Sequence, residues 1–257
     1  MKFSANLGFL WNDMPLPNAI MAAKTAGFDA VECHWPYEHA TADVQAALHA
    51  TGLTMLGLNT ARGDINKGEF GLSALPGRSK EARAAIDQAI AYATAIQAPN
   101  IHVMAGIATG DAAAQTFADN LGYACEKAAD CGKTILIEPI NSHDIPGYFL
   151  TTTDQALTFI NALGAANLKL MFDCYHVQRM GGDVFQQLTD LQPWIGHIQI
   201  AAVPDRGAPD HGELDYNKVF SLLKTLGHSA AIGAEYKPQG DTEQSLGWLK
   251  AQKAHCG

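Results

Sequence analysis

The sequence has no long hydrophobic run and relatively few basic residues. No apolar stretch approaches the roughly 18 residues that a membrane-spanning helix needs. Lysine and arginine number 17 against 26 aspartates and glutamates, which gives a formal net charge of −9. Because nucleic-acid-binding surfaces usually carry an excess of positive charge, this balance argues against such a partner. We therefore expect neither a membrane nor a nucleic-acid partner.

Cysteine is scarce and irregularly spaced. The five cysteines are Cys33, Cys125, Cys131, Cys174 and Cys256. Their spacing matches no zinc pattern, and the N-terminus shows no charged and apolar leader with a cleavage site. We therefore expect reduced thiols in a cytoplasmic protein, and homo-oligomer formation is left open.

Short apolar runs alternate with longer amphipathic runs along the chain. Strands are predicted near residues 3–8, 29–34, 54–59, 100–105, 134–138, 168–173, 196–201 and 230–235. Helices are predicted near residues 15–26, 41–51, 79–97, 111–131, 153–163, 183–191, 215–226 and 242–254. This alternation favours a parallel sheet with crossover helices. Eight units without a left-over element predict an α/β fold, a single (β/α)8 TIM barrel forming one domain over residues 1–257.

The third predicted strand is followed by a long polar segment, residues 59–78. A glycine-rich connection of about 20 residues is long for a loop between a strand and a helix. It predicts a lid over the face where the strands end.

Four predicted strands in the second half end in side chains that can bind a metal ion. They are Glu138, Asp173, Gln199 and Glu235. An unpaired buried carboxylate is costly, so these groups need a partner. Either each carboxylate caps a helix N-terminus or pairs with arginine, or the four groups share a cation at the rim where barrel strands end. Three carboxylates and one amide favour a hard divalent metal, Mg²⁺ or Mn²⁺ in the first place, with Ca²⁺ as an alternative.

Glu138 and Glu235 also suit acid–base chemistry. Two glutamates on opposite sides of the rim can flank one substrate, so that one removes a proton beside a carbonyl and the other returns one nearby. Polar and cationic side chains in the same region are candidate substrate-binding residues: His102, His176, Arg206 and Lys237. The cations among them can bind a carboxylate. We therefore expect a small anionic hydroxy- or keto-acid substrate.

Several segments together form a specific pattern. They are GDIN (63–66), GLSALPGR (71–78), HVMAG (102–106), IEPIN (137–141), PGYFL (146–150), DCYH (173–176), GHIQIA (196–201), PDHGELDY (209–216) and GAEYKP (233–238). These segments resemble the hydroxypyruvate isomerase family of the xylose-isomerase-like TIM-barrel superfamily. The resemblance implies that Glu138 and Glu235 donate and accept the proton. It also implies a metal site formed by Glu138, Asp173, Gln199 and Glu235.

The reaction implied is the interconversion of hydroxypyruvate and 2-hydroxy-3-oxopropanoate (tartronate semialdehyde) through an enediolate. A 2-oxo-tetronate isomerase is an alternative, because the segment 63–78 is also similar to those enzymes. A ketose 3-epimerase is a further alternative, although epimerases usually present histidine where this chain has Gln199. An endonuclease of the superfamily would need a basic face and more rim histidines. A non-catalytic sugar-acid-binding barrel would have no use for both Glu138 and Glu235.

Overall fold

The computed structural model describes residues 1–254, which form two compact units. Unit 1 contains residues 1–56, 173–193 and 197–254, and unit 2 contains residues 57–172 and 194–196. The prediction that residues 1–257 form one domain stays a prediction. Among the described helices, none has the length and hydropathy needed to cross a membrane.

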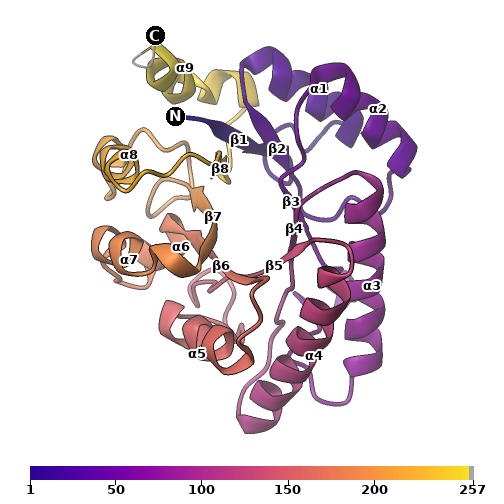
Figure 1. Ribbon diagram of the computed structural model, residues 1–257. Coiled ribbons are helices and arrows are strands. Elements are labelled where there is room, and N and C mark those ends of the chain that lie inside the picture. Colours follow the sequence, from indigo (N-terminus) through magenta and orange to yellow (C-terminus); the bar gives the residue numbers. More distant parts are fainter. Residues whose placement is uncertain (255–257) are drawn as a thin grey trace. The chain divides into compact units, whose positions relative to one another are not determined.

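Strands and helices alternate along the described chain (Figure 1). The strands are β1 (Phe3–Asn6), β2 (Ala30–Glu32), β3 (Gly57–Asn59), β4 (Asn100–His102), β5 (Thr134–Ile137), β6 (Leu168–Asp173), β7 (Ile195–Ile200) and β8 (Ile232–Ala234). The α-helices are α1 (Leu16–Ala26), α2 (Thr41–Thr51), α3 (Ser79–Ala95), α4 (Asp111–Ala129), α5 (Thr153–Leu163), α6 (Cys174–Arg179), α7 (Val184–Asp190), α8 (Tyr216–Thr225) and α9 (Gly247–Ala254). Short 3₁₀ helices are η1 (Ile65–Lys67), η2 (Gln192–Trp194) and η3 (Thr242–Ser245).

In unit 1 the parallel strands follow the order β2-β1-β8-β7. Apolar side chains fill one side of this sheet, where the ring of Phe3 meets Phe220 at 5.3 Å and Trp248 at 5.1 Å between centroids. Polar side chains occupy strand ends instead, and Asn6 on β1 lies in register with Glu32 on β2. The strand ends of unit 1 therefore concentrate buried polar groups beside an aromatic core.

In unit 2 the parallel strands follow the order β6-β5-β4-β3. Helix α3 buries a face rich in alanine, which lets a helix pack closely. Phe117 is fully buried and meets Phe149 at 5.5 Å and Phe159 at 5.1 Å between ring centroids. This apolar layer supports the strands that lead to His102 and Glu138.

The predicted lid, residues 59–78, divides into two parts. Its first part is largely accessible, and Ile65 is 62% exposed. Its second part is held against the segment after β4, because Gly71 forms a bridge with Ala105 and the Ala74 amide donates to the Ala105 carbonyl at 2.7 Å. The contacts with Ala105 therefore hold the buried residues 71–74 in place, whereas residues 65–68 are exposed.

The close approach of Gly71 and Gly106 requires glycine. Gly106 has φ +97°, and a Cβ there would lie 2.3 Å from the Gly71 carbonyl oxygen. We expect Gly106→Ala to lower the free energy of unfolding by roughly 1–3 kcal/mol through backbone strain, with the clash adding to it. Gly110→Ala is the matched control, since Gly110 has φ +84° but nothing within 4 Å of the added Cβ. Urea unfolding should show the larger loss for Gly106→Ala, and equal losses would contradict the role of the contact.

All eight predicted strands are present, with shifts of a few residues at their ends. The helix predicted over 242–254 is instead a 3₁₀ turn, η3, followed by α9. Helix α6 was not predicted, because its six residues are too few to show helical periodicity. Cys33, Cys125, Cys131 and Cys174 form no disulfide within the described part of the chain, and Cys256 lies outside it.

Candidate active site

The four predicted metal-ligand side chains all lie at or next to strand ends and are buried. Asp173 is the last residue of β6, and Gln199 is the penultimate residue of β7. Glu138 and Glu235 directly follow β5 and β8. Their exposed fractions are 5% for Glu138, 2% for Asp173, 3% for Gln199 and 5% for Glu235. Burial at strand ends agrees with the sequence prediction for each residue.

Glu235 is held by three donors within unit 1. Its Oε1 accepts from Asn6 Nδ2 at 2.9 Å and from His34 Nε2 at 2.9 Å, and its Oε2 accepts from Arg206 Nη2 at 2.5 Å. Burial alone would raise the pKa of Glu235, but the charge of Arg206 and the hydrogen bond from His34 outweigh it. The pKa of Glu235 is therefore held well below its usual value, and the side chain is a carboxylate.

Arg206 supplies much of the positive charge for this region of unit 1. Its Nη2 also lies 3.8 Å from Asp173 Oδ2, and its guanidinium stacks 4.9 Å from the Phe9 ring centroid and 5.0 Å from that of Tyr175. The predicted alternative, carboxylates paired with arginine, is thus partly realised. Stacking fixes the guanidinium plane, which favours directional binding of a carboxylate.

Lys237, the other predicted substrate-binding cation, is exposed. Its ammonium lies 5.7 Å from the Phe9 ring centroid, while its backbone amide donates to the Arg206 carbonyl at 2.7 Å. The structure therefore brings Arg206 into the buried group and leaves the side chain of Lys237 at the surface.

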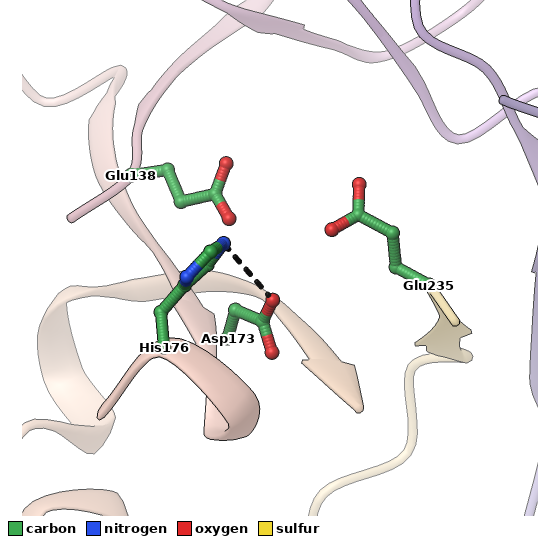
Figure 2. Close-up of side chains that lie close together, drawn as sticks. All are labelled: Glu138, Asp173, His176 and Glu235. Atoms are coloured by element: carbon green, nitrogen blue, oxygen red, sulfur yellow. Dashed lines mark ion pairs between the residues drawn. The ribbon is translucent and has the colours of Figure 1, made fainter. Parts of the chain in front are cut away.

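The two carboxylate oxygens of Asp173 have different surroundings. Its Oδ1 accepts from the Tyr175 amide at 2.8 Å and caps α6. Its Oδ2 is buried without a hydrogen bond and lies 3.6 Å from His176 Nε2, the pair marked in Figure 2. Burial raises the pKa of Asp173, and the charge of Glu235 adds to this while Arg206 opposes it.

Asp173, His176 and Glu235 could hold a metal ion. Each offers one ligand atom, and these atoms lie within 4.8 Å of one another; the carboxyl group of Glu235 points toward the other two in Figure 2. Two buried oxygens, Asp173 Oδ2 and Gln199 Oε1, have no hydrogen-bond partner, which is unusual in a folded interior. Oxygen donors with one imidazole fit Mg²⁺ or Mn²⁺. The donor set therefore fits the predicted cofactor, with His176 as an added candidate ligand.

Sequence reasoning missed a fourth buried carboxylate, Glu32. Its Oε1 accepts from Gln199 Nε2 at 2.8 Å and from Asn6 Nδ2 at 3.1 Å, and its Oε2 pairs with His197 Nε2 at 2.7 Å. Asn6 thereby donates to both Glu32 and Glu235. Asn6 and Glu32 each end a strand, so the signal that identified the four residues of the second half applied equally to these two.

The His197–Glu32 pair predicts a pH-dependent stability. Burial alone would lower the pKa of His197, but the charge and hydrogen bond of Glu32 outweigh it and raise that pKa above 6.5. Because the folded pKa is the higher one, the pair stabilises fully below pH 6.5 and loses this contribution as pH rises through the folded pKa.

We therefore expect the stability difference between the wild type and His197→Gln to shrink from pH 6 toward alkaline pH, measured by urea unfolding. His228→Gln provides the contrast, since burial lowers the pKa of His228 and its contribution is lost as pH falls. A wild-type advantage over His197→Gln that grew with pH would contradict the assignment.

Two of the predicted residues, His102 and Glu138, lie in unit 2. His102 Nδ1 lies 3.5 Å from Glu138 Oε2, and both side chains are buried. Nearby, the hydroxyl oxygen of Tyr148 accepts from the Ala105 amide at 3.0 Å, and burial raises the pKa of Tyr148. Glu138 therefore lies beside His102 in an interior that keeps Tyr148 protonated.

A cavity of about 200 Å³ in unit 1 lies beside His34. Its lining includes Asn12, Met14, Cys33, His34, Trp35 and His39. Since His34 also donates to Glu235, the cavity adjoins a residue that contacts a predicted catalytic glutamate. It is a candidate space for part of a small ligand.

The chain is similar to known proteins along nearly its full length. It is 47% identical over 253 residues to a 2-oxo-tetronate isomerase from Cupriavidus necator, covering 97% of each chain. It is 36% identical over 253 residues to the hydroxypyruvate isomerase of Escherichia coli, covering 97% of this chain and 98% of the other. The names of both relatives agree with the predicted enzyme class, an isomerase.

The comparison with solved structures agrees with the fold predicted from the sequence. A crystal structure of a family 2 AP endonuclease from Brucella melitensis superposes with a TM-score of 0.93 at 37% identity, covering 97% of this chain and 98% of that one. The model of the family described as Xylose isomerase-like TIM barrel matches residues 20–252. These findings confirm the predicted (β/α)8 fold class: the chain belongs to the Xylose isomerase-like TIM barrel family.

Proposed function

We propose that this protein is an isomerase of short 2-oxo acids, which moves a carbonyl between C2 and C3 through an enediolate. The observation that carries the proposal is the buried carboxylate of Glu235, held by Arg206 and His34 beside Asp173 and His176. Such a group can exchange a proton with carbon, and the adjacent guanidinium can bind an acid. Full-length similarity to isomerases supports the reaction class.

In this proposal Glu138 and Glu235 are the two proton carriers. One glutamate removes a proton from C3, the other delivers a proton to C2, and the hydroxyl proton on O3 is transferred to O2. The C-terminal strand ends of a TIM barrel form its active-site face, and both glutamates follow such ends. His102 and His176 hydrogen-bond substrate oxygens, and Lys237 contributes positive charge at the entrance.

Arg206 adjusts the basicity of Glu235 when substrate binds. In the described structure Arg206 stabilises the charged form of Glu235 and so makes it a weak base. A substrate carboxylate competes for the same guanidinium. As Arg206 shifts toward that carboxylate, the pKa of Glu235 rises and proton abstraction becomes easier.

Glu138, Asp173, Gln199 and Glu235 are the proposed ligands of a divalent cation, Mg²⁺ or Mn²⁺, with His176 close by. When bound, the cation would stabilise negative charge that develops on the substrate oxygens. The unpartnered oxygens of Asp173 and Gln199 support this assignment. The cytoplasm remains the proposed location.

Hydroxypyruvate and 2-oxo-tetronate are the two candidate substrates. The sequence motifs favoured hydroxypyruvate, whereas 47% identity to a 2-oxo-tetronate isomerase favours the four-carbon acid. Both undergo the same carbonyl shift, so the site chemistry does not separate them.

Comparing kcat/KM on hydroxypyruvate, 2-oxo-tetronate and its phosphate tests the proposal directly. We expect turnover of at least one, with one deuteron from D2O incorporated at C2 of the product. Deuterium exchange at C3 of a ketohexose, without turnover of any of these acids, would instead identify a ketose 3-epimerase.

A further inference from the structure

We propose that Glu32 is a positioning residue that orients the amide of Gln199 so that its oxygen, and not its nitrogen, is available to a cation. The inference rests on the proposed metal site and deepens it. Glu32 is 4% exposed and lies at the end of β2, whereas Gln199 lies on β7. Its carboxylate is outside the set of proposed ligands.

The orientation of Gln199 follows from what each group can donate. An amide has a donor end and an acceptor end, and an isolated glutamine can present either one to a ligand. Glu32 Oε1 is the acceptor, so Gln199 turns its NH2 group toward Glu32, and Nε2 lies 2.8 Å from that oxygen. Oε1 then faces away from Glu32, and it is the buried atom without a hydrogen-bond partner.

Glu32 is itself fixed from the other side. His197 donates from Nε2 to Glu32 Oε2 at 2.7 Å, and the two side chains are 7% and 5% exposed. Gly233 leaves the space this geometry needs, since a Cβ there would lie 2.6 Å from both Glu32 oxygens and 2.9 Å from Gln199 Cγ. A buried carboxylate with so little freedom can impose one orientation on its neighbour.

Glu32 is also linked to the proposed catalytic residue Glu235, through the side chain of Asn6. Asn6 Nδ2 donates to Glu32 Oε1 at 3.1 Å and to Glu235 Oε1 at 2.9 Å. Glu32 therefore orients two amides, those of Gln199 and Asn6, and each serves a different part of the site. Residues that orient metal ligands typically change metal affinity by about 10–100-fold when they are replaced.

The test measures Mn²⁺ binding by isothermal titration calorimetry. Glu32→Met removes the acceptor at similar size, and we expect the dissociation constant for Mn²⁺ to rise about 10–100-fold. Glu243→Met is the control, because it makes the same substitution at an exposed glutamate whose carboxylate accepts from Trp11 Nε1 at 2.6 Å. Its dissociation constant should equal that of the wild type.

A rescue variant separates orientation from general structural damage. Glu32→Met combined with Gln199→Glu places a carboxylate on β7, which presents an oxygen whichever way it turns. This pair also keeps the wild-type number of buried carboxylates. We expect the double variant to bind Mn²⁺ within a few-fold of the wild type. If Glu32→Met does not fold, Glu32→Asp, which withdraws the carboxylate by one methylene, replaces it with the same expectations.

Three results overturn the inference or its basis. Unchanged Mn²⁺ affinity in folded Glu32→Met, or in Glu32→Asp, removes the positioning role. Equal weakening in the single and double variants assigns Glu32 a structural role only. Asp173→Asn tests the site itself: if it binds Mn²⁺ like the wild type, the proposed metal site fails independently of Glu32.

Discussion

Glu235→Gln should lower kcat by about 10³-fold, within the range by which a positioned general acid or base contributes to catalysis. The amide cannot take up a proton from carbon at neutral pH. Steady-state kinetics on the accepted 2-oxo acid measures the loss, and solvent deuterium incorporation at C2 reports the proton transfer itself. Glu138→Gln should give a loss of similar size if the two glutamates share the reaction.

The substitution also changes hydrogen bonding, so a control is needed. Glu235 Oε1 accepts from Asn6 and His34, and Oε2 accepts from Arg206, so the amide leaves at least one donor without its acceptor. This costs about 1–3 kcal/mol of stability. Thermal unfolding should show a folded protein, and Glu243→Gln should retain full turnover. Near-wild-type kcat in either glutamate variant would refute the proposed mechanism.

Arg206→Met should destabilise the protein by about 3–5 kcal/mol, the usual result of removing one partner of a buried ion pair. The relevant side chains are 14% exposed for Arg206 and 7% for Glu235, so solvent screens the pair poorly. Asp173 loses a second favourable contact, at 3.8 Å. Turnover should also fall, because the substrate carboxylate loses its guanidinium.

Two comparisons make the Arg206 experiment specific. Arg206→Lys keeps the charge without the planar fork, so urea unfolding should show a smaller loss of stability while KM for the acid substrate rises. Excess Mn²⁺ should restore part of the stability of Arg206→Met, because binding to the folded state alone stabilises it. Equal stability of wild type and Arg206→Met would show that Glu235 does not depend on this cation.

Much of the fold followed from periodicity. The alternation of apolar and amphipathic runs identified every strand, because each buried strand carries a short apolar run bounded by turn residues. Helix α6 was not predicted, because its six residues are too few to show a helical periodicity. Asp173, which precedes it, was predicted only as a metal ligand. The helix exists because that same carboxylate caps it.

The contacts between the site residues were harder to predict than the residues themselves. The strand-end rule identified Glu138, Asp173, Gln199 and Glu235, and it applied equally to Glu32 and Asn6 in the first half. It could not show that Arg206 reaches Glu235 while Lys237 stays exposed, because loop conformation decides this. Arg206 itself has a φ of +57°, and no sequence pattern in its loop predicts this left-handed backbone conformation.

The contacts of Glu235 join the two ends of the chain. Its partner Asn6 is 229 residues away in sequence, and His34 is 201 residues away. A ribosome must therefore release nearly the whole chain before this carboxylate can meet its donors, and contacts of such separation form slowly. Until β8 joins β1, Asn6 and His34 lack the Glu235 carboxylate to which both donate. A chain that ends before β8 lacks Glu235, so it should be inactive even if its other strands pair.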